Sequence, residues 1–233
     1  MKVLAIDTAS ASCSAALLLG EHLLQRERLL ERGHAEAILP MVDELLAEAA
    51  VPLTALTAIA FGRGPGAFTG VRLAASVTQG LAFGAGVPVV PVSDLQAIAQ
   101  RALDAEPAIE RVLVCADARM HEVYRGCFER SPEGLARAVD AEEVLQPAAV
   151  RLPALWAERR PLAGAGSGFA AYPELRSGLT LDVILGDLLP HAAEIARLAV
   201  PEVVAGRFFQ AEQALPVYLR DDVTRPSAGA SRN

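Results

Sequence analysis

Short runs of apolar residues open the chain, and their length and spacing predict β-strands. Residues 2–8, 12–19 and 22–29 each form such a run, and a turn at Gly20-Glu21 separates the second run from the third. Runs of roughly four to eight residues that are bounded by small or polar residues are typical of strands. The pattern therefore predicts an antiparallel meander at the N-terminus.

Helical periodicity takes over after this meander. In residues 33–50 the apolar positions recur at intervals of three and four, which predicts an amphipathic helix. Its apolar stripe consists of Ala35, Ile38, Leu39, Val42, Leu45, Leu46 and Ala49. A buried strand, a second helix, a further strand and a helix capped by Ser93 are predicted over residues 58–62, 69–83, 87–90 and 93–103.

The same order of elements restarts near the middle of the chain. Residues 111–118 form an apolar run with an aspartate near its end, as residues 2–8 do, and a second run follows over residues 122–129. The glycine-rich turn after Leu162 also repeats the turn after Ile59. Self-similarity of this kind indicates an internal duplication.

The duplication suggests two domains of similar layout. We expect an N-terminal half over residues 1–107 and a C-terminal half over residues 108–233, because the segment between them breaks the periodicity. A late helix near residues 190–199 is expected to pack back on the first half, and residues 223–233 are expected to form a flexible tail. Two halves of βββαβαβα order are the layout of the actin, Hsp70 and sugar-kinase (ASKHA) superfold. The predicted fold class is therefore a duplicated α/β fold of this type, which does not by itself fix function.

Composition bounds the classes of function. The chain has 233 residues, of which 52% are hydrophobic, and a net charge of −7. An acidic surface argues against a stand-alone nucleic-acid binder, because binding phosphates needs basic groups. The three widely spaced cysteines predict reduced core thiols and hence a cytoplasmic protein. The uncharged stretch 73–93 is broken by glycines and prolines, which favours a buried helix and strand over a membrane span.

The glycine-rich run at residues 62–72 is the most distinctive local feature of the chain. It reads Gly-Arg-Gly-Pro-Gly-Ala-Phe-Thr-Gly-Val-Arg and leads into the second predicted helix, with Thr69 at the expected N-cap position. Glycines let backbone N–H groups turn toward an anion, and a helix N-terminus favours negative charge. The run lacks the Gly-Lys-Ser/Thr of a Walker loop, however. It predicts a fold element that seats the second helix, with phosphate binding as the weaker alternative.

Each predicted half carries an aspartate at the end of its first strand. In the superfold, such aspartates face the metal and phosphates of a nucleotide held between the halves. An active phosphotransferase is expected to follow each aspartate with glycine and a hydroxyl residue, whereas Asp7 is followed by Thr-Ala-Ser and Asp117 by Ala-Arg-Met. These turns favour a catalytically degenerate protein. Vestigial nucleotide or phosphate contacts are expected at Asp7, Thr8, Gly64, Gly66, Thr69 and Asp117.

The helix over residues 69–83 bears one charged residue, Arg72, near its start. A helix without a charged face is buried on more than one side. One reading is a core helix of a three-layer domain; the favoured reading is a protein–protein interface formed together with the helix over residues 33–50. The predicted partner-interface residues are His34, Ile38, Leu39, Val42, Leu46, Val71, Ala74, Ala75 and Thr78.

The sequence offers no legible metal site or activated nucleophile. A helix that binds a metal through His34 needs a second ligand four residues later, and that position is Ile38. The other histidines are scattered, and no nucleophile-elbow pattern is present. We therefore predict neither catalytic residues nor an intrinsic cofactor.

Several motifs match one known family. The chain resembles the TsaB (YeaZ) family of bacterial proteins in tRNA threonylcarbamoyladenosine synthesis. The matching motifs span both halves and are Leu4-Ala-Ile-Asp-Thr8, Gly64-Pro-Gly-Ala-Phe-Thr-Gly-Val-Arg72, Gly80-Leu-Ala82, Pro91-Val-Ser93 and Asp117-Ala-Arg-Met-His-Glu-Val-Tyr124. The glycine run together with the Asp-Ala-Arg-Met run is highly specific.

The resemblance implies a non-catalytic scaffold of the complex that forms N6-threonylcarbamoyladenosine at adenosine 37 of tRNAs reading ANN codons. It implies pairing, through the two N-terminal helices, with the catalytic subunit TsaD. TsaD holds a metal through a pair of histidines on its first helix, and in this chain Ile38 stands at the position of the second histidine. The ATPase TsaE is expected to join that pair. ATP and Mg²⁺ would be used by these partners, and tRNA would be reached only through the complex. A homodimer through the same surface is implied when the partner is absent.

Two other classes of function stay open at this point. The glycine run is compatible with an active ATP-dependent kinase or ATPase of the same superfold, which the missing glycines after Asp7 and Asp117 oppose. A metalloprotease-like hydrolase would need a zinc motif, and the sequence contains none.

Overall fold

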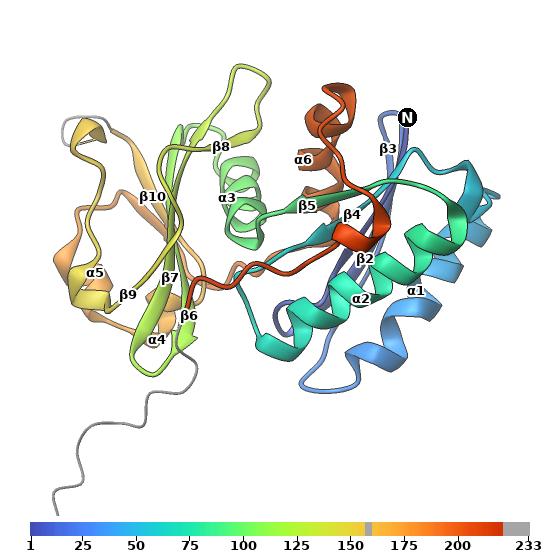
Figure 1. Ribbon diagram of the computed structural model, residues 1–233. Helices are drawn as coiled ribbons and strands as arrows, with labels where there is room; N and C mark the ends of the chain where they lie inside the picture. The colour runs from blue at the N-terminus through green and yellow to red at the C-terminus, as the bar shows by residue number, and fades with distance from the viewer. Residues whose placement is uncertain (157–159, 221–233) are drawn as a thin grey trace, which may run out of the picture.

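Two mixed β-sheets form the framework of the computed structural model, which describes residues 1–156 and 160–220 (Figure 1). The first sheet has the strand order β3-β2-β1-β4-β5. Its first strand pairs antiparallel with β2 and parallel with β4. The strands of this sheet are β1 (Lys2–Asp7), β2 (Ser12–Leu19), β3 (His22–Leu29), β4 (Ala58–Gly62) and β5 (Val89–Val92).

The second sheet repeats this order. Its strand order is β8-β7-β6-β10-β11, and β9 pairs with β7 outside this path. If the strands on the path are numbered within each half, both sheets have the order 3-2-1-4-5. Its strands are β6 (Arg111–Arg119), β7 (Glu122–Arg130), β8 (Ala136–Ala138), β9 (Glu143–Leu145), β10 (Leu162–Ala165) and β11 (Val183–Leu185). The predicted duplication is confirmed, and the fold is the duplicated ASKHA fold.

Helices cover the outer face of each sheet and fill the layer between the sheets (Figure 1). The outer helices are α1 (His34–Glu48) and α2 (Phe68–Ala85) on the first sheet, and α4 (Gly168–Ala171) and α5 (Glu174–Gly178) on the second. The helices α3 (Asp94–Ala105) and α6 (Ala192–Val204) occupy the middle layer. Short 3-10 turns lie at Leu53–Ala55, Pro147–Ala149, Ala154–Trp156 and Ala211–Gln213.

The last helix of each half packs on the sheet of the other half. α3 contacts β6, β7 and β8, whereas α6 contacts β1, β2 and β4. Side chains of a strand alternate between its two faces, so Val3 and Ala5 of β1 join the middle core, and Leu4 and Ile6 join the outer core under α1 and α2. Because both faces of the sheet are covered, β1 is apolar at successive positions rather than alternately.

The element boundaries follow the sequence pattern with local differences. Ser93 caps α3 as predicted, and its Oγ accepts a hydrogen bond from Gln96 N at 3.3 Å. The N-cap prediction for Thr69 is wrong, because α2 begins one residue earlier and Ala67 occupies the N-cap position without a side-chain hydrogen bond. The strand predicted over residues 87–90 lies two residues later, since Val87 N still bonds to Ala82 O at the end of α2.

The uncharged stretch 73–93 divides into most of α2 and the strand β5. Among residues 1–156 and 160–220, no helix combines the length and the apolar character needed to cross a bilayer. The expected flexible tail, residues 223–233, lies outside the described residues.

Candidate functional site

The glycine-rich turn between β4 and α2 packs directly against the turn that follows β1. A Cβ atom at Gly66 would lie 2.6 Å from the carbonyl oxygen of Ala9, and one at Gly70 would lie 2.0 Å from that of Thr8. Both distances are far below van der Waals contact, so only glycine permits this approach of two backbones. Two hydrogen bonds join the turns: Ala67 N donates to Ala9 O at 2.8 Å, and Thr8 Oγ1 donates to Gly70 O at 2.7 Å.

Asp7 ends β1 inside the protein rather than at an open cleft. Its side chain is fully buried, and its Oδ1 accepts a hydrogen bond from Ala9 N at 2.8 Å. Asp94, the first residue of α3, is also buried and accepts a hydrogen bond from Gly64 N. The two carboxyl groups lie next to each other, and Asp7 Oδ2 and Asp94 Oδ1 are buried without a hydrogen bond to any other group. A Cβ at Gly62 would lie 2.9 Å from Asp7 Oδ1 and 2.4 Å from Asp94 Oδ1.

Burial governs the protonation of this carboxyl pair. It raises the pKa of Asp7, and it raises the pKa of Asp94 well above its ordinary value, where the neighbouring charge of Asp7 adds to the effect. Two carboxylates in contact in a low-dielectric interior do not both ionise, so the pair shares one proton. An enclosed and half-neutralised pair is a poor ligand set for Mg²⁺, which prefers ionised oxygens and retains several waters.

The second strand-end aspartate is engaged by neighbours from its own half. Asp117 Oδ1 accepts hydrogen bonds from Tyr172 Oη at 2.8 Å and from Arg119 N at 2.9 Å, and its Oδ2 lies 3.2 Å from the Arg119 guanidinium. A Cβ at Gly166 or at Gly168 would lie 2.7 Å from Cys115 O. The second glycine turn therefore closes on β6 much as the first closes on β1.

The predicted nucleotide contacts thus divide into two groups. Asp7, Thr8 and Gly64 are buried, and the N–H groups of Gly64 and Ala67 already have acceptors within the chain. Thr69 is exposed in the first turn of α2, and Asp117 is half-buried. Within the described ranges, no cluster of three or more His, Cys, Asp or Glu side chains is arranged to hold a metal ion. The arrangement fits the close packing of two turns better than a phosphate cradle.

A cavity of about 310 Å³ lies where the two halves meet, on the side of the loop between β8 and β9. Glu142 crosses it, 3.2 Å from the Arg63 guanidinium and within hydrogen-bonding distance of Ser93 Oγ. Arg63 and Ser93 of the first half are therefore paired with Glu142 of the second half across this cavity.

Most of the predicted interface residues lie in the core of the chain itself. One side of α1 and one side of α2 pack on the first sheet, against residues of β1, β2 and β4. Six predicted residues lie on these sides, and each is at most 3% exposed: Ile38, Val42, Val71, Ala74, Ala75 and Thr78. In the chain itself these six side chains are buried against the first sheet and do not form part of its surface. The sequence did not reveal this, because α2 is uncharged on two sides and the pattern does not show which side meets the sheet.

The outward side of the two helices carries a different set of residues. Of the predicted residues, Leu39 is 44% exposed, and His34 and Leu46 are half-buried. From the exposed, uncharged positions of the two helices we take Leu39, Ser76, Gly80 and Phe83 as the outer helix face, and Phe83 is 71% exposed.

His34 has a local structural contact. Its Nε2 lies 2.9 Å from the carbonyl oxygen of Ser10, which ties the start of α1 to the turn between β1 and β2. Ile38, the position of a second metal ligand, is fully buried.

One contact at the start of α2 was not foreseen from the sequence. The Arg72 guanidinium stacks on Phe68 at 3.5 Å from the ring centroid, and its Nε donates to Tyr218 Oη at 2.7 Å. Tyr218 is 146 residues away and belongs to no periodic element, so the pattern gave no signal for it.

The sequence also matches known proteins. Residues 25–206 match the family model described as "TsaD: tRNA N6-adenosine threonylcarbamoyltransferase". The chain is 40% identical over 228 residues to the "tRNA threonylcarbamoyladenosine biosynthesis protein TsaB" of Escherichia coli, and the match covers 96% of each chain. The chain belongs to the TsaB family. The TsaB protein of Haemophilus influenzae is 39% identical over 234 residues, which cover 96% of this chain and 95% of that one.

Solved TsaB-family structures have the same fold. The structure described as "YeaZ from Pseudomonas aeruginosa" superposes with a TM-score of 0.87 at 45% identity, covering 94% of this chain and 99% of that chain. The resemblance inferred from the motifs is confirmed.

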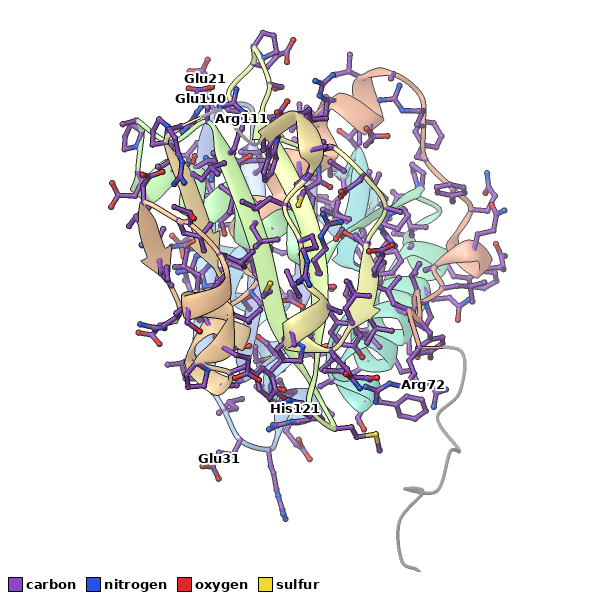
Figure 2. All side chains as sticks on the ribbon, turned by 90° about the vertical axis from the view of Figure 1, so that its left-hand side faces the viewer. Glu21, Glu31, Arg72, Glu110, Arg111 and His121 are labelled. Atoms are coloured by element: carbon purple, nitrogen blue, oxygen red, sulfur yellow. The ribbon has the colours of Figure 1, made fainter. Side chains whose placement is uncertain are left out.

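Two of the TsaB motifs lie at the same end of the molecule. The run from Gly64 to Arg72 forms the turn that meets Thr8, and the run from Asp117 forms the hairpin between β6 and β7. Figure 2 shows Arg72 and His121, one from each run, at the same end of the molecule. Residues that are far apart in the TsaB sequence therefore share one surface region.

Proposed function

We propose that the chain is a non-catalytic scaffold and activator in the formation of N6-threonylcarbamoyladenosine at adenosine 37 of tRNAs that read ANN codons. It pairs with the catalytic subunit TsaD, and the ATPase TsaE joins the pair. ATP and Mg²⁺ are used by these partners, and the complex works in the cytoplasm. Membership of the TsaB family supports the pathway, and the closed turns support the non-catalytic part.

The observation that carries the proposal is the closure of both aspartate turns. A nucleotide-dependent phosphotransferase needs backbone N–H groups and a carboxylate that can reach phosphate and metal. Here Asp7 is buried against Asp94, and Asp117 is bonded to Tyr172 and Arg119. This arrangement supports a subunit that keeps the frame of the superfold and leaves the chemistry to a partner.

The proposed contact with TsaD is the outer helix face. Ser76 and Gly80 are small, so a partner helix can approach the backbone of α2 closely, and Phe83 offers a large exposed ring as an anchor. A Cβ at Gly80 would meet no atom of the chain, so the surface there is open. When TsaD is absent, a second copy of the chain covers the same face in an isologous dimer.

Reconstitution of the modification tests the proposal. The chain, its TsaD and TsaE partners, an enzyme that supplies the threonylcarbamoyl adenylate and an unmodified tRNA transcript are combined, and the modified nucleoside is measured by mass spectrometry. We expect modification only when the chain is present. An equal rate in the mixture that lacks the chain contradicts the proposal.

An ATPase assay on the chain alone separates this proposal from the kinase alternative. We expect no sustained hydrolysis above the rate without protein. Hydrolysis that disappears in Asp7→Ala but persists in Asp187→Ala, which alters an exposed aspartate, would favour an active ATPase. Circular dichroism of both variants controls for loss of the fold.

A further inference from the structure

A group of arginine, aromatic and methionine side chains lies at the end of the molecule that carries Arg72 and His121 (Figure 2). We call it the arginine patch: Phe68, Arg72, Arg119, Met120 and Tyr218. The segment 215–220 connects its two parts, because Val217 N donates to Arg63 O at 2.7 Å and Arg220 contacts Ala118 O at 3.2 Å and Met120 Sδ at 3.4 Å. The start of α2 and the tip of the β6–β7 hairpin therefore belong to one surface.

Arg72 is held in place without an acidic partner. Its guanidinium lies 3.5 Å from the centroid of the Phe68 ring and 5.4 Å from that of Tyr218, to whose hydroxyl its Nε also donates. Among the described residues, no carboxylate lies within ion-pair distance of Arg72. Phe68 and Tyr218 remain 49% and 44% exposed. The result is an oriented cation between two accessible rings.

The hairpin tip presents the second part of the patch. Arg119, Met120 and His121 have φ angles of 62°, 54° and 59°, a left-handed run that non-glycine residues adopt at a cost. This run leaves Met120 75% exposed and the Arg119 side chain 87% exposed, whereas the Asp117 side chain that pairs with Arg119 is only 18% exposed. Of this ion pair, the positive member therefore faces outward, although the whole chain carries −7.

We propose that the arginine patch contacts the RNA substrate within the assembled complex. Guanidinium groups bind phosphates, and exposed rings and thioethers pack on unstacked bases, which is the combination that single-stranded RNA loops require. The inference rests on the proposed function, which brings tRNA to the complex. Because the chain as a whole is acidic, the patch adds to RNA binding by the other subunits instead of binding RNA alone.

Paired arginine variants test this assignment in the assembled complex. Arg72→Gln and Arg119→Gln are made singly and together, and Arg137→Gln on β8 is the matched control, since it removes an exposed arginine at the opposite end of β7. The probe is an unmodified tRNA transcript with a fluorescent label, titrated at several salt concentrations. We expect the double variant to bind about ten-fold more weakly, with a salt dependence reduced by about one unit of slope per arginine. The control should match the wild-type chain.

The assembly of the proteins is measured on the same samples by size-exclusion chromatography. Unchanged RNA affinity and unchanged salt slope in an intact complex overturn the inference. Loss of protein assembly, with normal RNA affinity in whatever complex remains, also overturns it and assigns the patch to a protein partner. Modification by the wild-type complex is followed in parallel: its absence counts against the proposed function, whereas an active complex with unaltered RNA binding by the variants counts against the arginine patch alone.

Discussion

The interpretation of the glycine run can be tested at Gly70. This residue lies within α2, where exchanging glycine for alanine normally stabilises a helix by about 1 kcal/mol. At Gly70, however, the new Cβ would lie 2.0 Å from the carbonyl oxygen of Thr8. Since both atoms are fixed to backbones, no side-chain rotation relieves the overlap. We therefore expect Gly70→Ala to destabilise the chain.

The size of the effect follows from the geometry. The new Cβ and the carbonyl oxygen of Thr8 must move apart by at least about 1 Å. Such a shift corresponds to the upper end of the range of destabilisation that overpacked cores show, about 3 kcal/mol. The gain in helix propensity offsets about 1 kcal/mol of this. The expected loss in the free energy of unfolding is therefore about 2 kcal/mol. The same shift weakens the hydrogen bond from Thr8 Oγ1 to Gly70 O.

Gly80→Ala is the matched control, because it changes the same residue type in the same helix but meets no atom of the chain. It should stabilise the chain by up to about 1 kcal/mol. Urea unfolding, followed by circular dichroism and by the fluorescence of the single buried Trp156, measures both variants. Equal stabilisation by the two substitutions would refute the close approach of the two turns. It would instead indicate that residues 62–72 form an open loop.

Three further outcomes are expected. Phe83→Ala should weaken TsaD binding about 10- to 100-fold in calorimetry, because burying roughly 100 Å² of exposed ring contributes up to about 3 kcal/mol, whereas Leu155→Ala in the other half should not. Ala75→Arg should fail to fold into soluble protein in an expression and unfolding assay, because it forces a charge into the core beneath α2. Asp94→Asn should flatten the pH dependence of the free energy of unfolding. Folding raises the pKa values of Asp7 and Asp94, so the wild-type pair stabilises the folded chain most at a pH below the ordinary aspartate pKa. This stabilisation is lost as the pH rises through the raised pKa values. Urea unfolding from pH 4 to pH 8 measures this, and an unchanged slope would contradict the shared proton.

The regular elements were largely predictable from the sequence. The strands β2 and β3 have the predicted boundaries, because polar or small residues interrupt the apolar runs where the chain turns. The duplication was also legible, since each half begins with a strand that ends near an aspartate. These features depend on local chemistry, which a sequence pattern records directly.

The surface of α2 could not be predicted in the same way. Apolar or small residues surround this helix, so periodicity alone did not distinguish the stripe of Val71, Ala74 and Thr78, which is buried, from the outer helix face. The stack of Arg72 on Phe68 and Tyr218 and the pairing of Asp7 with Asp94 depend on tertiary contacts between distant segments. No spacing rule relates such residues, so only the three-dimensional arrangement brings them together.

The exchange of final helices between the halves has a consequence for synthesis of the protein on the ribosome. The strands of the first sheet are complete once Val92 has been made, but the helix that covers the inner side of that sheet begins at Ala192. At about 5–20 residues per second, the ribosome adds the intervening segment in roughly 5–20 s. During that time Val3, Ala5 and Ala16 lack their final cover. The nascent N-terminal half therefore exposes apolar surface until α6 emerges, and a chain that stops short of α6 leaves the inner face of the first sheet uncovered.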